Sequence, residues 1–135
     1  MPSNRVLIHG GKIWYASKPM SEGRAQARLR KLAERLEECA MLCQVGGWTV
    51  LHRPTTPTAL EELRRAAEAE SYQKGFAALP HMEWAHKEGQ LWCLGTGGWY
   101  RVSEHACSCP HYALRCAGVG ILCKHQAAAK IRGLI

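Results

Sequence analysis

The fold of this chain is decided by one stretch near its carboxyl end, Cys107–His125, which reads CSCPHYALRCAGVGILCKH. Two cysteines separated by one residue, Cys107 and Cys109, are followed after thirteen residues by Cys123 and His125. Three thiolates and one imidazole form the ligand set of a closed structural zinc site. The spacing therefore predicts that Cys107, Cys109, Cys123 and His125 bind one structural zinc ion.

The flanking sequence predicts the elements that carry these ligands. Short β-rich runs at 91–94 and 99–103 surround Gly95-Thr96-Gly97-Gly98 and predict a hairpin. A short helix is expected over 124–131, so Cys123 precedes this helix and His125 lies in its first turn. Because residues i and i+2 of a regular helix do not share a face, the second ligand pair can bind one ion only at such a junction.

Further cysteines and histidines leave alternatives open. Cys116 and His111 lie inside the thirteen-residue loop, and Cys93 and His105 are near, so any of these could replace an assigned ligand. Buried thiols also occur as small apolar core residues. We expect Cys93 and Cys116 to pack beneath the hairpin in that way.

The arrangement resembles the SWIM-type zinc finger, in which C-x-C and C-x-H pairs follow an aromatic hairpin and precede a short helix. The matching text is Leu91-Trp-Cys-Leu, Trp99-Tyr-Arg-Val, Cys107-Ser-Cys-Pro and Cys123-Lys-His-Gln-Ala, within about residues 90–133. The resemblance implies a ββα zinc module with these four ligands and a role in DNA binding or protein interaction. In that family the module is usually an appendage of transposases, helicase-like ATPases, transcription factors or recombination factors.

Composition excludes several enzyme classes. The 135 residues contain no aspartate and no P-loop motif, so the transposase and ATPase activities of the family do not carry over. His81-Met-Glu83 imitates half of a zinc deaminase motif, but the P-C-x-x-C partner is missing. We therefore expect a protein that is not an enzyme.

The amino-terminal part is predicted to be a hairpin, a helix and a strand. Gly10-Gly11 separates short β-rich runs at 6–9 and 12–15, which indicates a tight hairpin. Ser21 is expected to cap a long helix over 22–44, whose apolar positions, Cys39 and Cys43 included, recur at helical spacing. Gly46-Gly47 would end this helix, and a strand is expected over 48–52.

The middle of the chain is predicted less sharply. Thr58-x-x-Glu61 indicates a capping box at the start of a second helix that reaches about Ser71. Residues 72–90 suggest a broken helix interrupted at Gly75 and Pro80. The fold class is thus α+β, with an amino-terminal region at 1–89 and a SWIM-like zinc finger at 90–135.

Charge points to a polyanionic partner. The net charge is +7, and by counting, residues 1–52 and 91–135 each carry +4. On the expected long helix a basic row steps by four, three and four residues, and a second basic group surrounds the zinc motif. The nucleic-acid contacts are therefore predicted to be Arg24, Arg28, Lys31, Arg35, Arg101, Arg115, Lys124, Lys130 and Arg132. Five tryptophans could also include stacking platforms for unpaired bases, although most are expected in the core.

These observations predict a zinc-stabilised nucleic-acid-binding protein, with DNA as the expected partner, in DNA recombination, repair or regulation. The alternative is a protein-interaction adaptor in a recombination or repair assembly, and a homo-oligomer is also possible. An absent signal sequence, an absent membrane span and many cysteines predict a cytoplasmic protein, nucleoid-associated in a bacterium.

Overall fold

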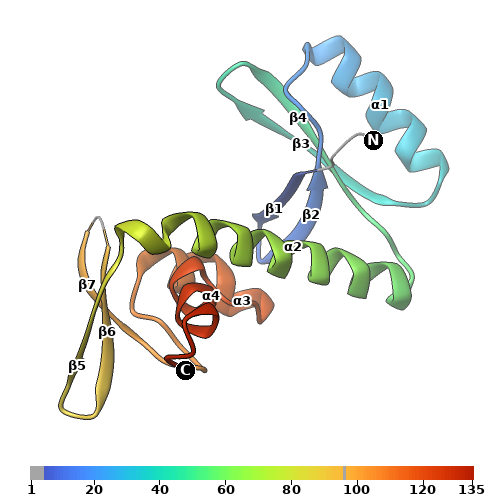
Figure 1. The fold of residues 1–135 in the computed structure, drawn as a ribbon. Helices are drawn as coiled ribbons and strands as arrows, with labels where there is room; N and C mark the ends of the chain where they lie inside the picture. The colour runs from blue at the N-terminus through green and yellow to red at the C-terminus, as the bar shows by residue number, and fades with distance from the viewer. Residues whose placement is uncertain (1–4, 96) are drawn as a thin grey trace. The chain divides into compact units, whose positions relative to one another are not determined.

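A computed structural model describes residues 5–95 and 97–135 of the chain (Figure 1). Contacts divide the chain into two compact units, Met1–Ala66 and Ala67–Ile135. Helices and strands are mixed in the chain as a whole, which confirms the predicted α+β class. None of the described helices is both long enough and apolar enough to cross a bilayer.

The first unit is an antiparallel sheet with a helix across one face. Its strands lie in the order β1-β2-β4-β3, and α1 connects the two hairpins. The elements are β1 (Arg5–His9), β2 (Lys12–Ala16), α1 (Glu22–Glu34), β3 (Glu38–Gln44) and β4 (Gly47–Arg53). The helix buries Ala25 and Leu32 against Val50 of β4.

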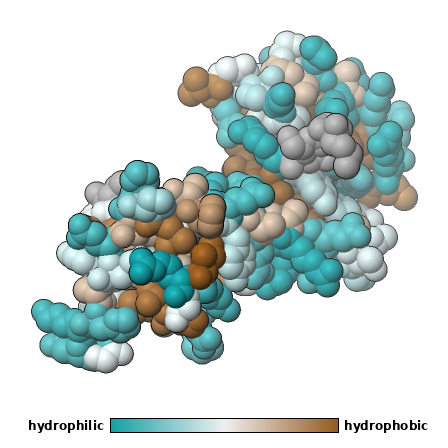
Figure 2. Space-filling view, viewed as in Figure 1, coloured by the Kyte–Doolittle hydropathy of each residue, from teal (hydrophilic) through white to brown (hydrophobic). Residues whose placement is uncertain are grey.

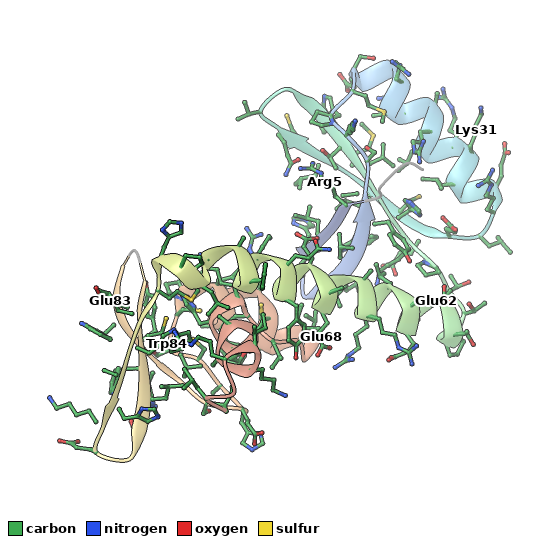
Figure 3. All side chains as sticks on the ribbon, in the orientation of Figure 1. Arg5, Lys31, Glu62, Glu68, Glu83 and Trp84 are labelled. Carbon is green, nitrogen blue, oxygen red and sulfur yellow. The ribbon has the colours of Figure 1, made fainter. Side chains whose placement is uncertain are left out.

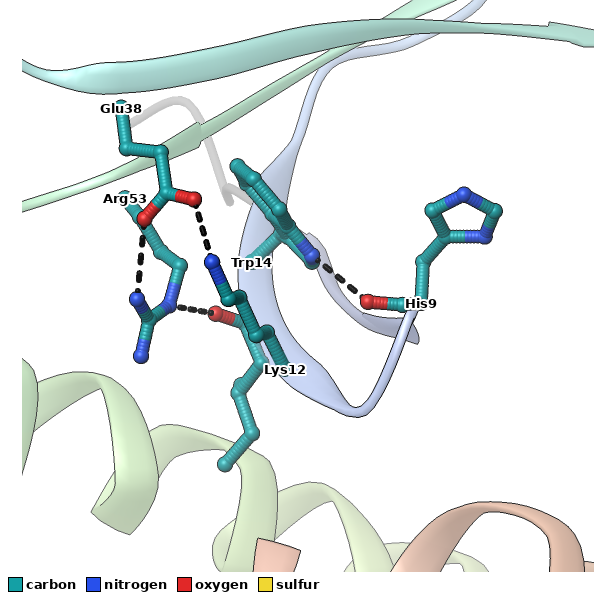
Figure 4. Close-up of polar contacts among 6 residues, drawn as sticks. His9, Lys12, Trp14, Glu38 and Arg53 are labelled. Atoms are coloured by element: carbon teal, nitrogen blue, oxygen red, sulfur yellow. Dashed lines mark hydrogen bonds and ion pairs between the residues drawn. The ribbon is translucent and has the colours of Figure 1, made fainter. Parts of the chain in front are cut away.

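The amino-terminal hairpin forms as predicted. Gly10 and Gly11 have φ values of 61° and 73°, the left-handed backbone that a two-residue turn between paired strands requires. Lys12 then pairs with His9 across the strands. Lys12 also connects this hairpin to β3, because its ammonium group donates a hydrogen bond to Glu38 at 2.6 Å. Arg53 donates a second hydrogen bond to Glu38 at 3.0 Å (Figure 4).

The long helix over 22–44 is a wrong prediction in its second half. Ser21 does cap α1, because its hydroxyl accepts a hydrogen bond from the Arg24 amide. The helix ends at Glu34, and Leu36 turns the chain with a φ of 59°. The Glu37 amide donates back to the Leu32 carbonyl at 3.4 Å, which closes a Schellman turn. Glycine is usual at that left-handed position, so a leucine there carried no stop signal.

Residues Glu38–Gln44 form β3 instead of a further helical turn. The strand pairs with β4. Val45 and Gly46 form the turn between the two strands and Gly47 begins β4, so the glycine pair does not end a helix. Cys39 and Cys43 are four residues apart, a spacing that suits one helical turn and one side of a strand equally. Cys39 lies against the α1 cluster, whereas Cys43 is exposed.

The helix α2 (Pro57–Ala78) starts earlier and ends later than predicted. Thr56, not Thr58, provides the capping oxygen, which accepts a hydrogen bond from the Ala59 amide at 3.3 Å. Gly75 does not interrupt the helix. A Cβ at Gly75 would lie 2.8 Å from the Lys124 carbonyl oxygen, so this glycine permits a close helix crossing.

The second unit combines the end of α2 with a three-stranded sheet and short helices. Its antiparallel strands lie in the order β5-β6-β7, and β5 was not predicted. The elements after α2 are a 3-10 turn at Leu79–His81, β5 (Glu83–Lys87), β6 (Gln90–Gly95), β7 (Gly98–Val102), a π-helical turn at Tyr112–Cys116, α3 (Ala117–Val119) and α4 (Lys124–Ile131). The β6–β7 hairpin and α4 confirm the sequence prediction, and Thr96 of the hairpin turn lies outside the described residues.

Candidate metal centre

Four potential metal ligands converge inside the second unit. The ligand atoms of Cys107, Cys109, Cys123 and His125 all lie within 4.8 Å of one another. All four side chains are buried, with exposed fractions of 5% or less. The His125 Nδ1 atom lies 3.9 Å from Cys107 Sγ and 4.0 Å from Cys123 Sγ, so Nδ1 is the nitrogen that faces the sulfurs.

The first ligand pair is held by the end of β7. Cys107 forms an isolated β-bridge with Val102. The Ser108 amide donates to the Arg101 carbonyl at 3.0 Å, and the Ser108 hydroxyl accepts from the Arg101 amide at 2.8 Å. Both hydrogen bonds join Ser108 to Arg101, through the amide and through the hydroxyl. The two neighbouring cysteines, Cys107 and Cys109, are therefore held in place at the end of β7.

The loop between β7 and Cys107 is closed by a serine. The Ser103 amide donates to the Ala106 carbonyl at 2.8 Å, and the Ser103 hydroxyl accepts from the amides of His105 and Ala106. This local bonding is the common use of serine in turns. The turn brings the chain back along β7 so that the first two thiols point into the unit.

The second ligand pair lies at the amino terminus of α4, as predicted. Cys123 has extended backbone and forms the N-cap, so Lys124 begins the helix and His125 lies in its first turn. The side chain of Gln126 accepts from the Cys123 amide at 3.0 Å and donates to the Ser103 carbonyl at 3.1 Å. One buried amide group thereby connects the two halves of the ligand set.

The ring of His125 is positioned by β6 and β7. It packs against Tyr100, with ring centroids 5.2 Å apart. A Cβ at Gly95 would lie 2.8 Å from the Tyr100 ring and 3.2 Å from His125 Nε2. Gly95 therefore provides the space in which the tyrosine and histidine rings fit together.

Hydrogen bonds among the three cysteine sulfurs favour the thiolate form of Cys109. Bonds from Cys107 and then Cys123 lower the pKa of Cys109 far below its ordinary value. The same hydrogen bonds raise the pKa of Cys107 to about 11 and also raise the pKa of Cys123. The Tyr112 amide also points at Cys109 Sγ, at 3.3 Å. A bound divalent cation would replace the shared protons and deprotonate all three thiols.

The donor set fits zinc. With bonds of ~2.3 Å to sulfur and ~2.0 Å to nitrogen, tetrahedral ligands are roughly 3.6–3.8 Å apart, close to the two sulfur–nitrogen distances given above. Three sulfurs and one imidazole complete the tetrahedron and leave no position for a substrate. The cluster therefore fits a single structural zinc ion.

The alternative ligands stay outside the cluster. Cys93 and Cys116 are fully buried, as predicted, and burial raises the pKa of each thiol to about 11. Cys116 Sγ lies 3.7 Å from His111 Nδ1, where burial lowers the pKa of the histidine. In the described part of the chain, the metal-competent group contains none of these three residues.

Comparison with known families agrees with this geometry. Residues 91–133 match the model of the SWIM zinc finger. The match spans the segment that the sequence motif indicated, from the start of β6 to just beyond α4. No curated protein and no solved structure matches the chain. The segment that is similar to the SWIM zinc finger therefore contains all four ligands.

The predicted basic row lies on the first unit. Arg24, Arg28 and Lys31 are exposed on α1, and with Met20 and Ala27 they line a shallow hollow of about 260 Å³. Figure 3 shows Lys31 projecting from the helix, and Figure 2 shows mainly hydrophilic side chains over this region. Arg35 is exposed as well, but as the C-cap of α1 and not as a residue inside a longer helix.

The second predicted basic group surrounds the zinc cluster. Arg101, Arg115, Lys130 and Arg132 are exposed, and Lys124 is half-buried at the start of α4. Glu104 is the single carboxylate in residues 91–135. The five basic residues therefore keep their surroundings positive, even after three thiolates on one zinc ion contribute a charge of about −1.

Three supporting residues escaped the sequence analysis. Gln126 stands three residues after the N-cap, which is the capping-box position, so the sequence carried a usable signal for it. Tyr100 and Gly95 had no such signal, because their role depends on how β6 and β7 pair. The register places both residues on the same face of the sheet as Cys93.

Proposed function

We propose that this protein is a non-enzymatic nucleic-acid-binding protein, with DNA as its partner, whose zinc ion is structural. One observation carries the proposal. None of the nine basic side chains assigned to nucleic acid forms an ion pair within the described residues. Several basic groups on other surfaces are paired with carboxylates: Lys12 and Arg53 bind Glu38, and Lys74 binds Glu70.

Unpaired cations on an exposed surface are suited to phosphates. Neutralising phosphates releases condensed counterions, which makes binding strongly dependent on salt. The spacing of Arg24, Arg28 and Lys31 along one side of α1 gives a row of contacts without any base-reading geometry. The proposal is therefore affinity for the backbone, in a process such as recombination, repair or regulation.

Binding of labelled single-stranded and duplex DNA at two or more salt concentrations, with and without a chelator, tests this function. The double variant Arg28→Glu with Lys31→Glu should weaken binding and flatten the plot of log K against log salt by about two units. The matched control, Arg65→Glu with Lys74→Glu, makes the same change in net charge at two residues that are already paired on α2. Equal affinities for the row variant and the wild-type protein would refute a role for the row.

A protein-interaction adaptor is the second candidate. Phe76 and Leu114 of the second unit are 68% and 82% exposed, which is unusual for large apolar side chains. Partner binding that persists at high salt and is lost in Leu114→Ser would favour this reading. Salt-sensitive retention on DNA would favour the first.

A further inference from the structure

The sheet of the second unit has two unlike faces. Register and alternation place Leu91, Cys93 and Val102 on one face, and all three are buried. The side chains that alternate with them form what we call the outer sheet face, made of Glu83, Ala85, Lys87, Gln90, Trp92, Leu94, Trp99 and Arg101. Trp92 pairs with Arg101 and Leu94 pairs with Trp99, so both tryptophans and the arginine are neighbours.

The helices of this unit lie on the opposite face. Tyr100, whose side chain alternates with those of Trp99 and Arg101, packs against His125 of α4. Figure 3 shows Trp84 on the side of the sheet toward the helices and Glu83 on the other side. Glu83 pairs with Leu94, which confirms that the outer sheet face points away from the zinc cluster.

The outer sheet face exposes an aromatic ring beside a cation. Trp99 is 47% exposed, and Arg101, two residues along the same strand, is exposed without an ion pair in the described part of the chain. The charged side chains of the outer sheet face are Lys87 and Arg101, both basic, and Glu83, which is acidic. An apolar protein segment would not use the charge of Arg101. A polyanion that also carries flat rings, such as a nucleic acid, would contact both the Trp99 ring and the Arg101 side chain.

We propose that the outer sheet face binds single-stranded nucleic acid, with an unpaired base on Trp99 and a backbone phosphate at Arg101. A ring on a sheet can stack on a base of any sequence, provided that the base is not already paired in a duplex. The inference rests on the proposed nucleic-acid function and adds the strand state and the surface that selects it. The basic row on α1 provides contacts that do not depend on strand state.

The test compares a labelled oligothymidine of about 15 nucleotides with a duplex of the same length, on the full zinc-loaded chain. Trp99→Ala should weaken oligothymidine binding about tenfold and leave duplex binding unchanged, because stacking on one base is lost. Trp99→Phe should retain most of the affinity, and Arg101→Gln should reduce the salt dependence by about one unit. Leu114→Ala is the control, since it removes an exposed apolar side chain outside the sheet.

The outcomes separate this inference from the proposed function. If Trp99→Ala binds both oligonucleotides like the wild type while the α1 double variant is weakened, the outer sheet face is refuted and the nucleic-acid function stands. Equal weakening for single strand and duplex also refutes it, and absence of binding to either refutes both. If Trp99→Ala fails to retain zinc, Trp99→Phe decides: oligothymidine must quench less tryptophan emission in this variant than in the wild type, and equal quenching overturns the proposal.

Discussion

The two compact units close their interiors by different means. The first buries Trp14, Leu32, Val50 and Leu51, large apolar side chains that a sheet and a helix press together. The second buries Leu91, Val102 and Ile121 together with five thiols, those of the three ligand cysteines and of Cys93 and Cys116. Burial of apolar area stabilises the first unit directly. The second unit depends on what its thiols bind.

Small residues explain why the second unit needs an ion. In α4, Ala127, Ala128 and Ala129 are each fully buried, and a Cβ at Gly75 of α2 would lie within 3.2 Å of atoms of Lys124, Ala127 and Ala128. Such close packing brings the helices together but removes little apolar surface from water per residue. In small domains of this kind, metal binding supplies much of the folding free energy.

The largest expected effect comes from removing one ligand. Cys123→Ser should lose most of the zinc and the protection of residues 67–135, because apparent zinc-binding energies of about 10–16 kcal/mol are coupled to folding. Hydrogen exchange measured by mass spectrometry on the full chain follows both units at once. Cys43→Ser is the matched control, since its thiol is exposed in the first unit. If the amides of residues 67–135 keep their protection from hydrogen exchange in Cys123→Ser, the second unit does not depend on zinc for its stability.

The reciprocal change should act on the first unit alone. Leu51→Ala truncates a fully buried side chain in the cluster with Trp14 and Ala16, and should destabilise that unit by about 2–5 kcal/mol. Zinc content, measured by elemental analysis, should stay at the wild-type value. A variant that loses both stability and zinc would show that the units are not separate.

Adding one methyl group beside the zinc cluster, at Gly95, tests the packing of the second unit. Gly95→Ala should weaken zinc retention and destabilise the second unit by about 1–3 kcal/mol, because the new Cβ overlaps the Tyr100 ring and crowds His125. Gly118→Ala makes the same change where nothing lies within 4 Å and should leave zinc retention intact. Chelator titration compares the two variants, and identical curves would contradict the packing described around His125.

The smallest expected effect concerns the exposed ion pairs of the first unit. Hydrogen bonds from Lys12 and then Arg53 lower the pKa of Glu38. A carboxyl whose pKa is lowered by folding contributes stability above its unfolded pKa and loses it as the pH falls through the folded pKa. Glu38→Gln should therefore lower the Tm slightly at neutral pH and have no effect in acid. A difference that persists in acid would point to a cause other than charge.

The carboxyl-terminal third was predictable because its signals do not compete. Ligand spacing, paired glycines and the position of Cys123 before a helix all indicate one arrangement. The structure has it, except that helical turns at Tyr112–Cys116 and Ala117–Val119 replace the expected loop between the ligand pairs. The amino-terminal unit was partly mispredicted because residues 36–43 fit helical and strand spacing equally. Leu36 occupies a left-handed turn position where glycine would have marked the end of the helix.

The site shows the same limit. Residue types and spacing identify the four ligands, but the nitrogen of His125 that faces the sulfurs depends on the packing of Tyr100 and Gly95. Those residues are brought to His125 by the register of β6 and β7, which pairs Cys93 with Tyr100. Local sequence patterns carry no record of such a distant contact.

The most direct test of a zinc-held second unit is metal analysis of the full chain combined with hydrogen exchange before and after chelation. The account predicts one zinc ion per chain, replaceable by cobalt with a tetrahedral spectrum of three sulfurs and one nitrogen. Chelation should then expose the amides of residues 67–135 and spare those of the first unit. A protein that contains no metal, yet protects both units equally, would contradict it.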